Sequence, residues 1–136
     1  MNSISKLELT LEELAVLESE MLKKSKNKEA AWGLWFGLSF FGAHRFYTEN
    51  YKYASAMLLT SIIPIFAIII MLLTTTTYNG FNLFFLFLFI LFLAGSVIWS
   101  WVDAFFLNKR IEELNDNAEH EILLSIAAQR RAKKPE

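Results

Sequence analysis

Three ionisable side chains stand beside long apolar stretches in this sequence: His44, Arg45 and Asp103. A histidine next to a carboxylate can move protons, so the set is a candidate acid/base group. The sequence supplies no second carboxylate, nucleophile motif, phosphate-binding loop or cluster of metal ligands to support it. Cysteine is absent, which excludes thiolate chemistry and disulfides. We therefore expect no catalytic residue, no metal, no cofactor and no enzyme activity.

A structural role explains the same residues better. Charged groups at the edge of an apolar helix are costly unless they are paired or hydrated. An arginine can direct two parallel N–H groups at one carboxylate. We predict that Arg45 and Asp103 form a partly buried ion pair. The neighbouring rings of Phe46, Tyr47 and Trp99 suit the zone where hydrocarbon meets water.

The apolar stretches are long enough to cross a bilayer. Residues 54–102 contain no Asp, Glu, Lys or Arg, and one crossing needs about 20 apolar residues. Three hydrophobic segments are expected at 30–47, 53–73 and 81–107, with a polar, uncharged loop at 74–80. The first segment has only a short uncharged part, which is typical of a short, tilted or partly inserted helix. Pro64 should kink the second segment.

Both ends of the chain are predicted to be amphipathic helices. Thr10 and Glu13 fit a capping box that begins a helix reaching Lys24. Its apolar stripe lies at helical spacing and consists of Ile4, Leu7, Leu11, Leu14 and Met21. The stripe is either the edge of a coiled coil or a face that packs on the rest of the protein, and two short heptads favour packing. In the C-terminal tail, residues 115–117 (Asn-Asp-Asn) should break the helix and cap a new one.

Charge indicates the topology. Four lysines precede the first hydrophobic segment and are expected both to hold this end in the cytoplasm and to contact anionic lipid headgroups: Lys23, Lys24, Lys26 and Lys28. Two full crossings, with a first segment that dips in and returns, would place both termini and residues 44–52 in the cytoplasm. Three full crossings are the alternative. Either way the protein is expected to be a multi-pass protein of the cell membrane.

Two motifs resemble those of the TM2 domain family. The first is Trp32-Gly33-Leu34-Trp35-Phe36-Gly37-Leu38 followed by Gly42-Ala43-His44-Arg45-Phe46-Tyr47, and the second is Ile98-Trp99-Ser100-Trp101-Val102-Asp103. The resemblance covers roughly residues 28–107 and implies a small helical membrane protein without a defined biochemical activity. It marks seven motif residues: Gly42, His44, Arg45, Phe46, Tyr47, Trp99 and Asp103. The family commonly continues the turn with Leu-Gly, where this chain has Thr48-Glu49, and the longer apolar region supports an extra crossing.

The expected fold is an all-α integral membrane protein with two to three hydrophobic helices in a TM2-like core. We predict an N-terminal helix and basic linker over residues 1–28, a membrane domain over 29–107 and a charged helical tail over 108–136. The function indicated is a membrane-anchored interaction or regulatory element, with an unidentified protein partner for its terminal helices. A homo-oligomeric pore or transport element is the alternative, although ion pores usually display charged rings or exposed carbonyls. A formal net charge of −1 gives no basic field for nucleic acid.

Overall fold

The computed structural model describes residues 5–132, and every regular element in that range is a helix. The elements are η1 (Lys6–Glu8), α1 (Leu11–Lys24), α2 (Lys28–Leu38), η2 (Ser39–Phe41), α3 (Ala43–Tyr47), α4 (Tyr51–Thr74) and α5 (Gly80–Ala132). They form two compact units, one of residues 28–108 and one that combines residues up to 27 with residues from 109 onward. We call these the membrane unit and the terminal unit.

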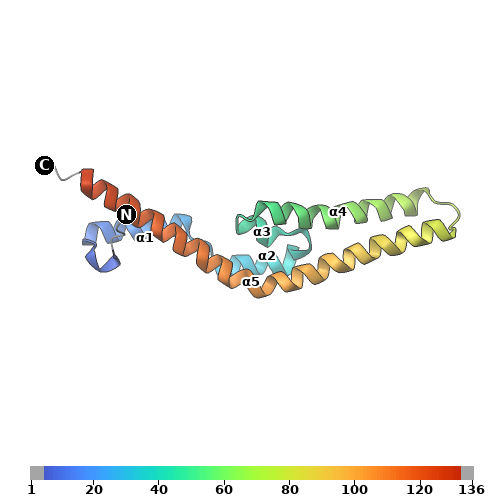
Figure 1. The fold of residues 1–136 in the computed structure, drawn as a ribbon, viewed down its shortest axis with the longest axis horizontal. Helices are drawn as coiled ribbons and strands as arrows, with labels where there is room; N and C mark the ends of the chain where they lie inside the picture. The colour runs from blue at the N-terminus through green and yellow to red at the C-terminus, as the bar shows by residue number, and fades with distance from the viewer. Residues whose placement is uncertain (1–4, 133–136) are drawn as a thin grey trace. The chain divides into compact units, whose positions relative to one another are not determined.

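Two helices carry the apolar character of the membrane unit. Helix α4 and the first half of α5 run antiparallel and are joined by residues 75–79 (Figure 1). Both are long and apolar enough to cross a bilayer, yet only 17% and 6% of their most apolar stretches are buried inside the protein. The core helix of a soluble protein would be mostly buried. Exposed aromatic and aliphatic side chains over both helices therefore fit contact with lipid.

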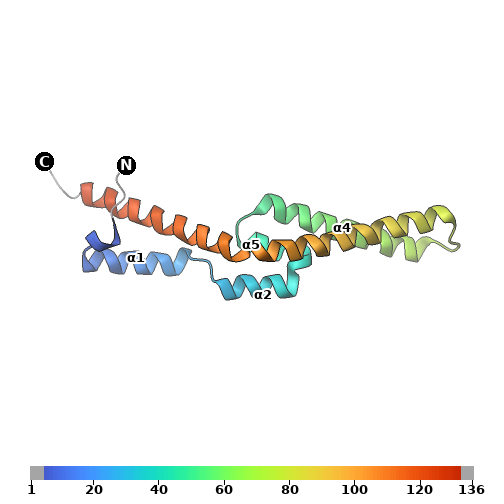
Figure 2. The same ribbon diagram turned by 60° about the horizontal axis from the view of Figure 1, so that its bottom comes forward.

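The first hydrophobic segment does not form a single helix. It divides into α2, η2 and α3, which lie at the end of the hairpin away from the connecting loop (Figures 1 and 2). Helix α2 has eleven residues, about 16 Å at 1.5 Å per residue, whereas the hydrocarbon core is about 30 Å thick. The segment therefore cannot cross the bilayer as α2 alone, and two helices remain as candidate spans.

The buried residues of the two helices recur at helical spacing: Ala54, Met57, Ser61 and Pro64 on α4, and Ser96, Ser100, Asp103 and Leu107 on α5. Ala54 and Met57 face the turn at Gly42, and Ser61 and Ser96 meet in the seam between α4 and α5. Ser61 Oγ donates to the carbonyl of Phe40 over 2.5 Å, and the Ser61 and Ser96 hydroxyls lie 2.8 Å apart. Because Ser61 has one proton, Ser96 is the donor to Ser61. Helix α4 continues through Pro64.

The terminal unit pairs α1 with the C-terminal part of α5 (Figures 1 and 2). The predicted capping box is present: Thr10 accepts from the Glu13 N–H, and Glu13 accepts from the Thr10 N–H. The helices are antiparallel, because ion pairs join Lys24 to Glu121 and Glu13 to Arg130. Their shared core consists of Leu17, Ile122, Leu123 and Ile126, with Leu9 and Met21 packed against it. Packing on the rest of the protein is thus confirmed for α1.

Two expectations about the terminal helices are wrong. Leu7 and Leu11 do not pack, since they are 97% and 87% exposed, and Leu17 occupies the core instead. Leu14 and Met21 of the predicted stripe are half-buried, and Leu17 takes the position between them, which leaves the charged Glu18 exposed. Ile4, the remaining stripe residue, lies outside the described residues. The helix also does not break at residues 115–117, because Asn115 bonds across to the backbone N–H and carbonyl of Lys26 while α5 continues.

Candidate functional site

The short helix α3 carries four of the predicted motif residues, and two of them, His44 and Arg45, are buried. It follows Gly42, which has a φ of +75° and lies so close to α4 that a Cβ would meet the Ala54 carbonyl oxygen at 3.1 Å. Only glycine adopts this backbone without strain at such an approach. At the other end, the Thr48 hydroxyl donates to the His44 carbonyl over 3.0 Å. The turn therefore fixes His44 and Arg45 toward the inside of the membrane unit, where both are buried.

His44, Arg45 and Asp103 form a buried cluster, which we call the Asp103 cluster. The predicted ion pair is present and bidentate: Arg45 Nε donates to Asp103 Oδ2 over 2.6 Å, and Arg45 Nη2 donates to Oδ1. His44 Nε2 lies 2.5 Å from the same Oδ2. Asp103 is 2% exposed, and Arg45 is 7% exposed. Both carboxylate oxygens are thus occupied, which suits a structural clamp better than an acid/base catalyst.

The geometry selects a tautomer for His44. An ionised carboxylate only accepts, so the ring nitrogen that faces Asp103 must carry a proton. The other nitrogen, Nδ1, is buried without a hydrogen-bond partner among the described residues, as is Ser100 Oγ. His44 Nε2 therefore donates to Asp103 Oδ2.

Several contacts around the cluster were missed by the sequence analysis. The Tyr53 ring lies 4.8 Å from the Arg45 guanidinium carbon, in cation–π geometry. The Trp35 indole donates to the Ser100 carbonyl over 2.9 Å, and the Trp32 indole donates to Asn108 Oδ1 over 2.8 Å. The spacing of Trp32 and Trp35 places them on one helix face, and that is the signal that could have indicated them. These contacts attach α2 and α4 to the cluster from two sides.

The remaining motif residues lie at the surface of the membrane unit or close to it. Phe46 is 37% exposed and packs on Tyr51, with ring centroids 6.4 Å apart. Tyr47 and Trp99 are half-buried. The structure thus brings His44, Arg45 and Asp103 together, and the hydrogen bonds that join these three residues do not involve Phe46, Tyr47 or Trp99.

The lysines proposed for lipid contact are engaged with protein groups. Lys23 lies 2.6 Å from Glu20, and Lys24 lies 3.5 Å from Glu121. The backbone N–H and carbonyl of Lys26 bond to Asn115. All of these side chains keep solvent access or partial access. Their carboxylate partners reduce the positive charge that Lys23 and Lys24 offer to an anionic surface.

One perturbed carboxyl group lies outside the membrane unit. Glu13 accepts from Arg130 Nε over 3.0 Å and from Nη2 over 2.5 Å. This hydrogen bonding, with the Thr10 backbone N–H as a second donor, lowers the pKa of Glu13 from 4.5 to about 2. The same contact raises the pKa of Arg130. In the described part of the chain, no group of three or more His, Asp or Glu side chains is placed to hold a metal ion.

Comparison with known proteins agrees with this architecture. Residues 24–75 match the family model of the TM2 domain. That range includes α2, the glycine turn, α3 and α4, and it ends before the α5 motif with Trp99 and Asp103. No curated protein and no solved structure matches the chain. Residues 24–75 therefore resemble a TM2 domain within a chain that has two candidate membrane spans. Asp103 binds Arg45 in the turn of that segment from a helix outside the matched residues.

Proposed function

We propose that this protein is a membrane-anchored interaction element, in which the membrane unit is the anchor and the terminal unit binds a protein partner. The observation that carries the proposal is the folding of both chain ends into one helix pair that still exposes large apolar side chains. Leu7, Leu11 and Leu22 are 97%, 87% and 84% exposed, although the pair has its own core of buried residues. Exposed leucines on a helix pair that is otherwise charged mark an interaction surface.

The composition of this surface favours a protein over a lipid headgroup layer. Leu11, Ala15 and Leu22 share one face of α1, and Glu12 and Glu18 lie on either side of that face. Carboxylates beside the leucines repel anionic headgroups, whereas they suit a helix with apolar and basic residues. Contact with anionic lipid is assigned instead to the lysines at the C-terminal end of α1 and after it.

The Asp103 cluster supports an anchoring role in place of catalysis or transport. Both oxygens of its carboxylate are held by Arg45 and His44, so the cluster locks α3 against α5. The buried polar side chains of the seam end at Ser61 and Ser96. Beyond them toward the loop, the hollow between the helices is lined by Leu59, Thr60, Ile63, Pro64, Phe89 and Phe92. An ion path would need polar groups or charges through that half as well.

Two measurements test the proposal together. Purified protein in liposomes should give no ion leak above that of protein-free liposomes. In cells, a photo-crosslinking residue at Leu11 or Leu22 should yield a discrete protein adduct, and the same residue at the exposed Gln129 should not. Ion leak that rises with the amount of protein would support the pore instead. Equal crosslinking from all three positions would contradict a specific binding face.

A further inference from the structure

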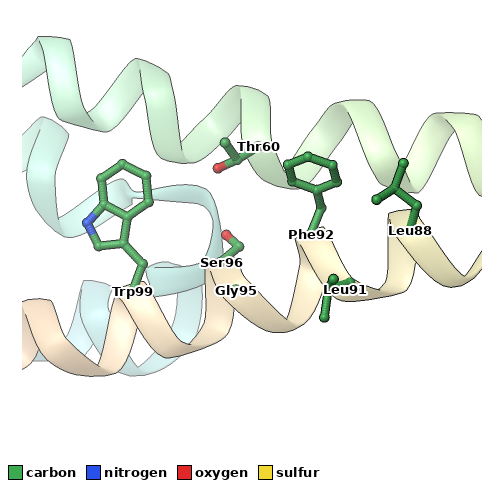
Figure 3. Close-up of a pocket in the computed structure, with 7 residues that line it drawn as sticks. All are labelled: Thr60, Leu88, Leu91, Phe92, Gly95, Ser96 and Trp99. Atoms are coloured by element: carbon green, nitrogen blue, oxygen red, sulfur yellow. The ribbon is translucent and has the colours of Figure 1, made fainter.

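A hollow opens along the lipid-facing side of the membrane unit. It has a volume of about 250 Å³ and lies between α4 and α5. Figure 3 shows its lining, in which only Thr60 comes from α4 and the rest from α5: Leu88, Leu91, Phe92, Gly95, Ser96 and Trp99. We call it the Gly95 groove. It is separate from the Asp103 cluster and takes no part in the proposed anchoring role.

The groove exists because small residues stand where the two helices face each other. A Cβ built on Gly95 would meet nothing within 4 Å. The two hydroxyls of the lining are engaged within the protein: the Thr60 hydroxyl lies 2.9 Å from the Ala56 carbonyl oxygen, and Ser96 bonds to Ser61. A retained water needs two to four polar partners. The groove therefore suits an apolar occupant.

Its dimensions select the kind of occupant. From Leu88 to Trp99 the groove follows eleven residues of α5, about 16 Å at 1.5 Å per residue. A volume of about 250 Å³ spread over that length makes the groove long and narrow. A single hydrocarbon chain can lie along such a groove, whereas a helix about 10 Å wide, such as one from a second copy, is too thick to enter it.

We propose that the Gly95 groove seats one acyl chain of a membrane lipid. Its length of about 16 Å equals the depth of one leaflet, since the hydrocarbon core is about 30 Å thick. Trp99 lies one helical turn from Asp103, at the charged end of the apolar stretch. The ester end of the lipid therefore lies near Trp99, and the chain end lies near Leu88. A chain held between two helices exchanges more slowly than lipid on their outer faces.

Photolabelling tests directly whether an acyl chain occupies the Gly95 groove. The full chain is placed in phosphatidylcholine vesicles with a trace of phosphatidylcholine that carries a diazirine on one acyl chain. Labelled positions are then mapped by mass spectrometry. Adducts should concentrate several-fold on residues 88–99 over Phe66 and Ile70, which are 60% and 58% exposed on α4 but do not line the groove. Equal labelling of all lipid-facing residues would overturn the proposal.

Two glycine variants on the same helix give the matched comparison. Gly95→Leu fills the groove and should lower labelling of residues 88–99 several-fold, and Gly95→Ala should lower it less. Gly80→Leu also adds a side chain where nothing lies within 4 Å but stands outside the groove, so labelling should not change. Unchanged labelling in both Gly95 variants would contradict binding of an acyl chain in the groove. Efficient disulfide formation between two copies through Leu91→Cys would also contradict it, because a second copy of the protein would then lie at the groove.

Discussion

The Asp103 cluster shows how a charge is tolerated at the end of an apolar helix. Asp103 interrupts the long uncharged run of the sequence, and its two oxygens accept from Arg45 and His44. Such a pair adds little net stability, because both ions must leave water to form it. The ion pair is therefore recognised by the loss of stability when one of its two residues is removed and the other is left.

A double-mutant cycle on Arg45 and Asp103 measures that loss of stability. Arg45→Ala and Asp103→Ala should each lower the thermal stability of the protein in detergent, because each leaves one charge buried and unpaired. The double variant should be less unstable than the sum of the two by on the order of 1–3 kcal/mol. Lys52→Ala removes an exposed cation from α4 and should leave stability nearly unchanged. Strict additivity of the two losses would show that the residues act independently.

The ion pair could be predicted from sequence, whereas its surroundings could not. Arg45 and Asp103 were linked because unpaired charges beside apolar helices are costly and two crossings place them at the same membrane face. The role of His44 depends on the left-handed turn at Gly42, which sequence spacing does not specify. The Tyr53 and Trp35 contacts join residues from different helices. Such contacts depend on the angles at which helices pack, and periodicity carries no information about them.

At the scale of the elements, the turn between η2 and α3 depends on one glycine. Gly42→Ala should destabilise the membrane unit by about 1–2 kcal/mol through its left-handed backbone alone. The added Cβ would also lie 3.1 Å from both the Ala54 carbonyl oxygen and Met57 Cβ. Gly37→Ala, in helix α2 with nothing within 4 Å, is the control and should be neutral or stabilising. Equal melting temperatures for the two variants would contradict the role assigned to Gly42.

The helix pair of the terminal unit should respond to acid. Arg130 holds the pKa of Glu13 at about 2, below its ordinary value of 4.5. A depressed pKa stabilises the folded pair above the ordinary value, and this contribution is lost as the pH falls from about 5 to about 2. Hydrogen exchange of α1 amides, corrected for intrinsic rates, should show that loss of protection. In Arg130→Gln the protection should be lower at neutral pH and change less with acid; identical profiles would refute the contact.

Element boundaries were predicted well where local chemistry sets them. The capping box at Thr10 and Glu13 fixed the start of α1. The apolar face was only partly predicted, because Leu17 and Leu11 are equally apolar and only the partner helix decides which is buried. Likewise, Asn115 resembles a helix breaker in isolation. Its bonds to Lys26 satisfy the side chain within a continuous helix.

At the scale of the whole molecule, the two candidate spans are α4, inside the segment that matches the TM2 domain, and α5, outside it, and the proposed role of both is to anchor the terminal helix pair. The expected topology places residues 1–28, 44–52 and 108–136 in the cytoplasm and the threonine loop outside. Basic residues flank the cytoplasmic segments, and residues 74–80 carry no charge, so moving this loop across costs least. The division of the hydrophobic sequence into two long helices and a broken first segment supports two crossings over three.

The most direct test of this anchoring account is the accessibility of single cysteines, since the native chain has none. Cysteines at Ser25, Asn50, Thr76 and Asp116 are treated with a membrane-impermeant thiol reagent in intact cells and again after lysis. The account predicts that only Thr76→Cys reacts in intact cells and that all four react after lysis. Reaction of Asn50→Cys and Asp116→Cys in intact cells, without Thr76→Cys, would contradict it and establish three crossings.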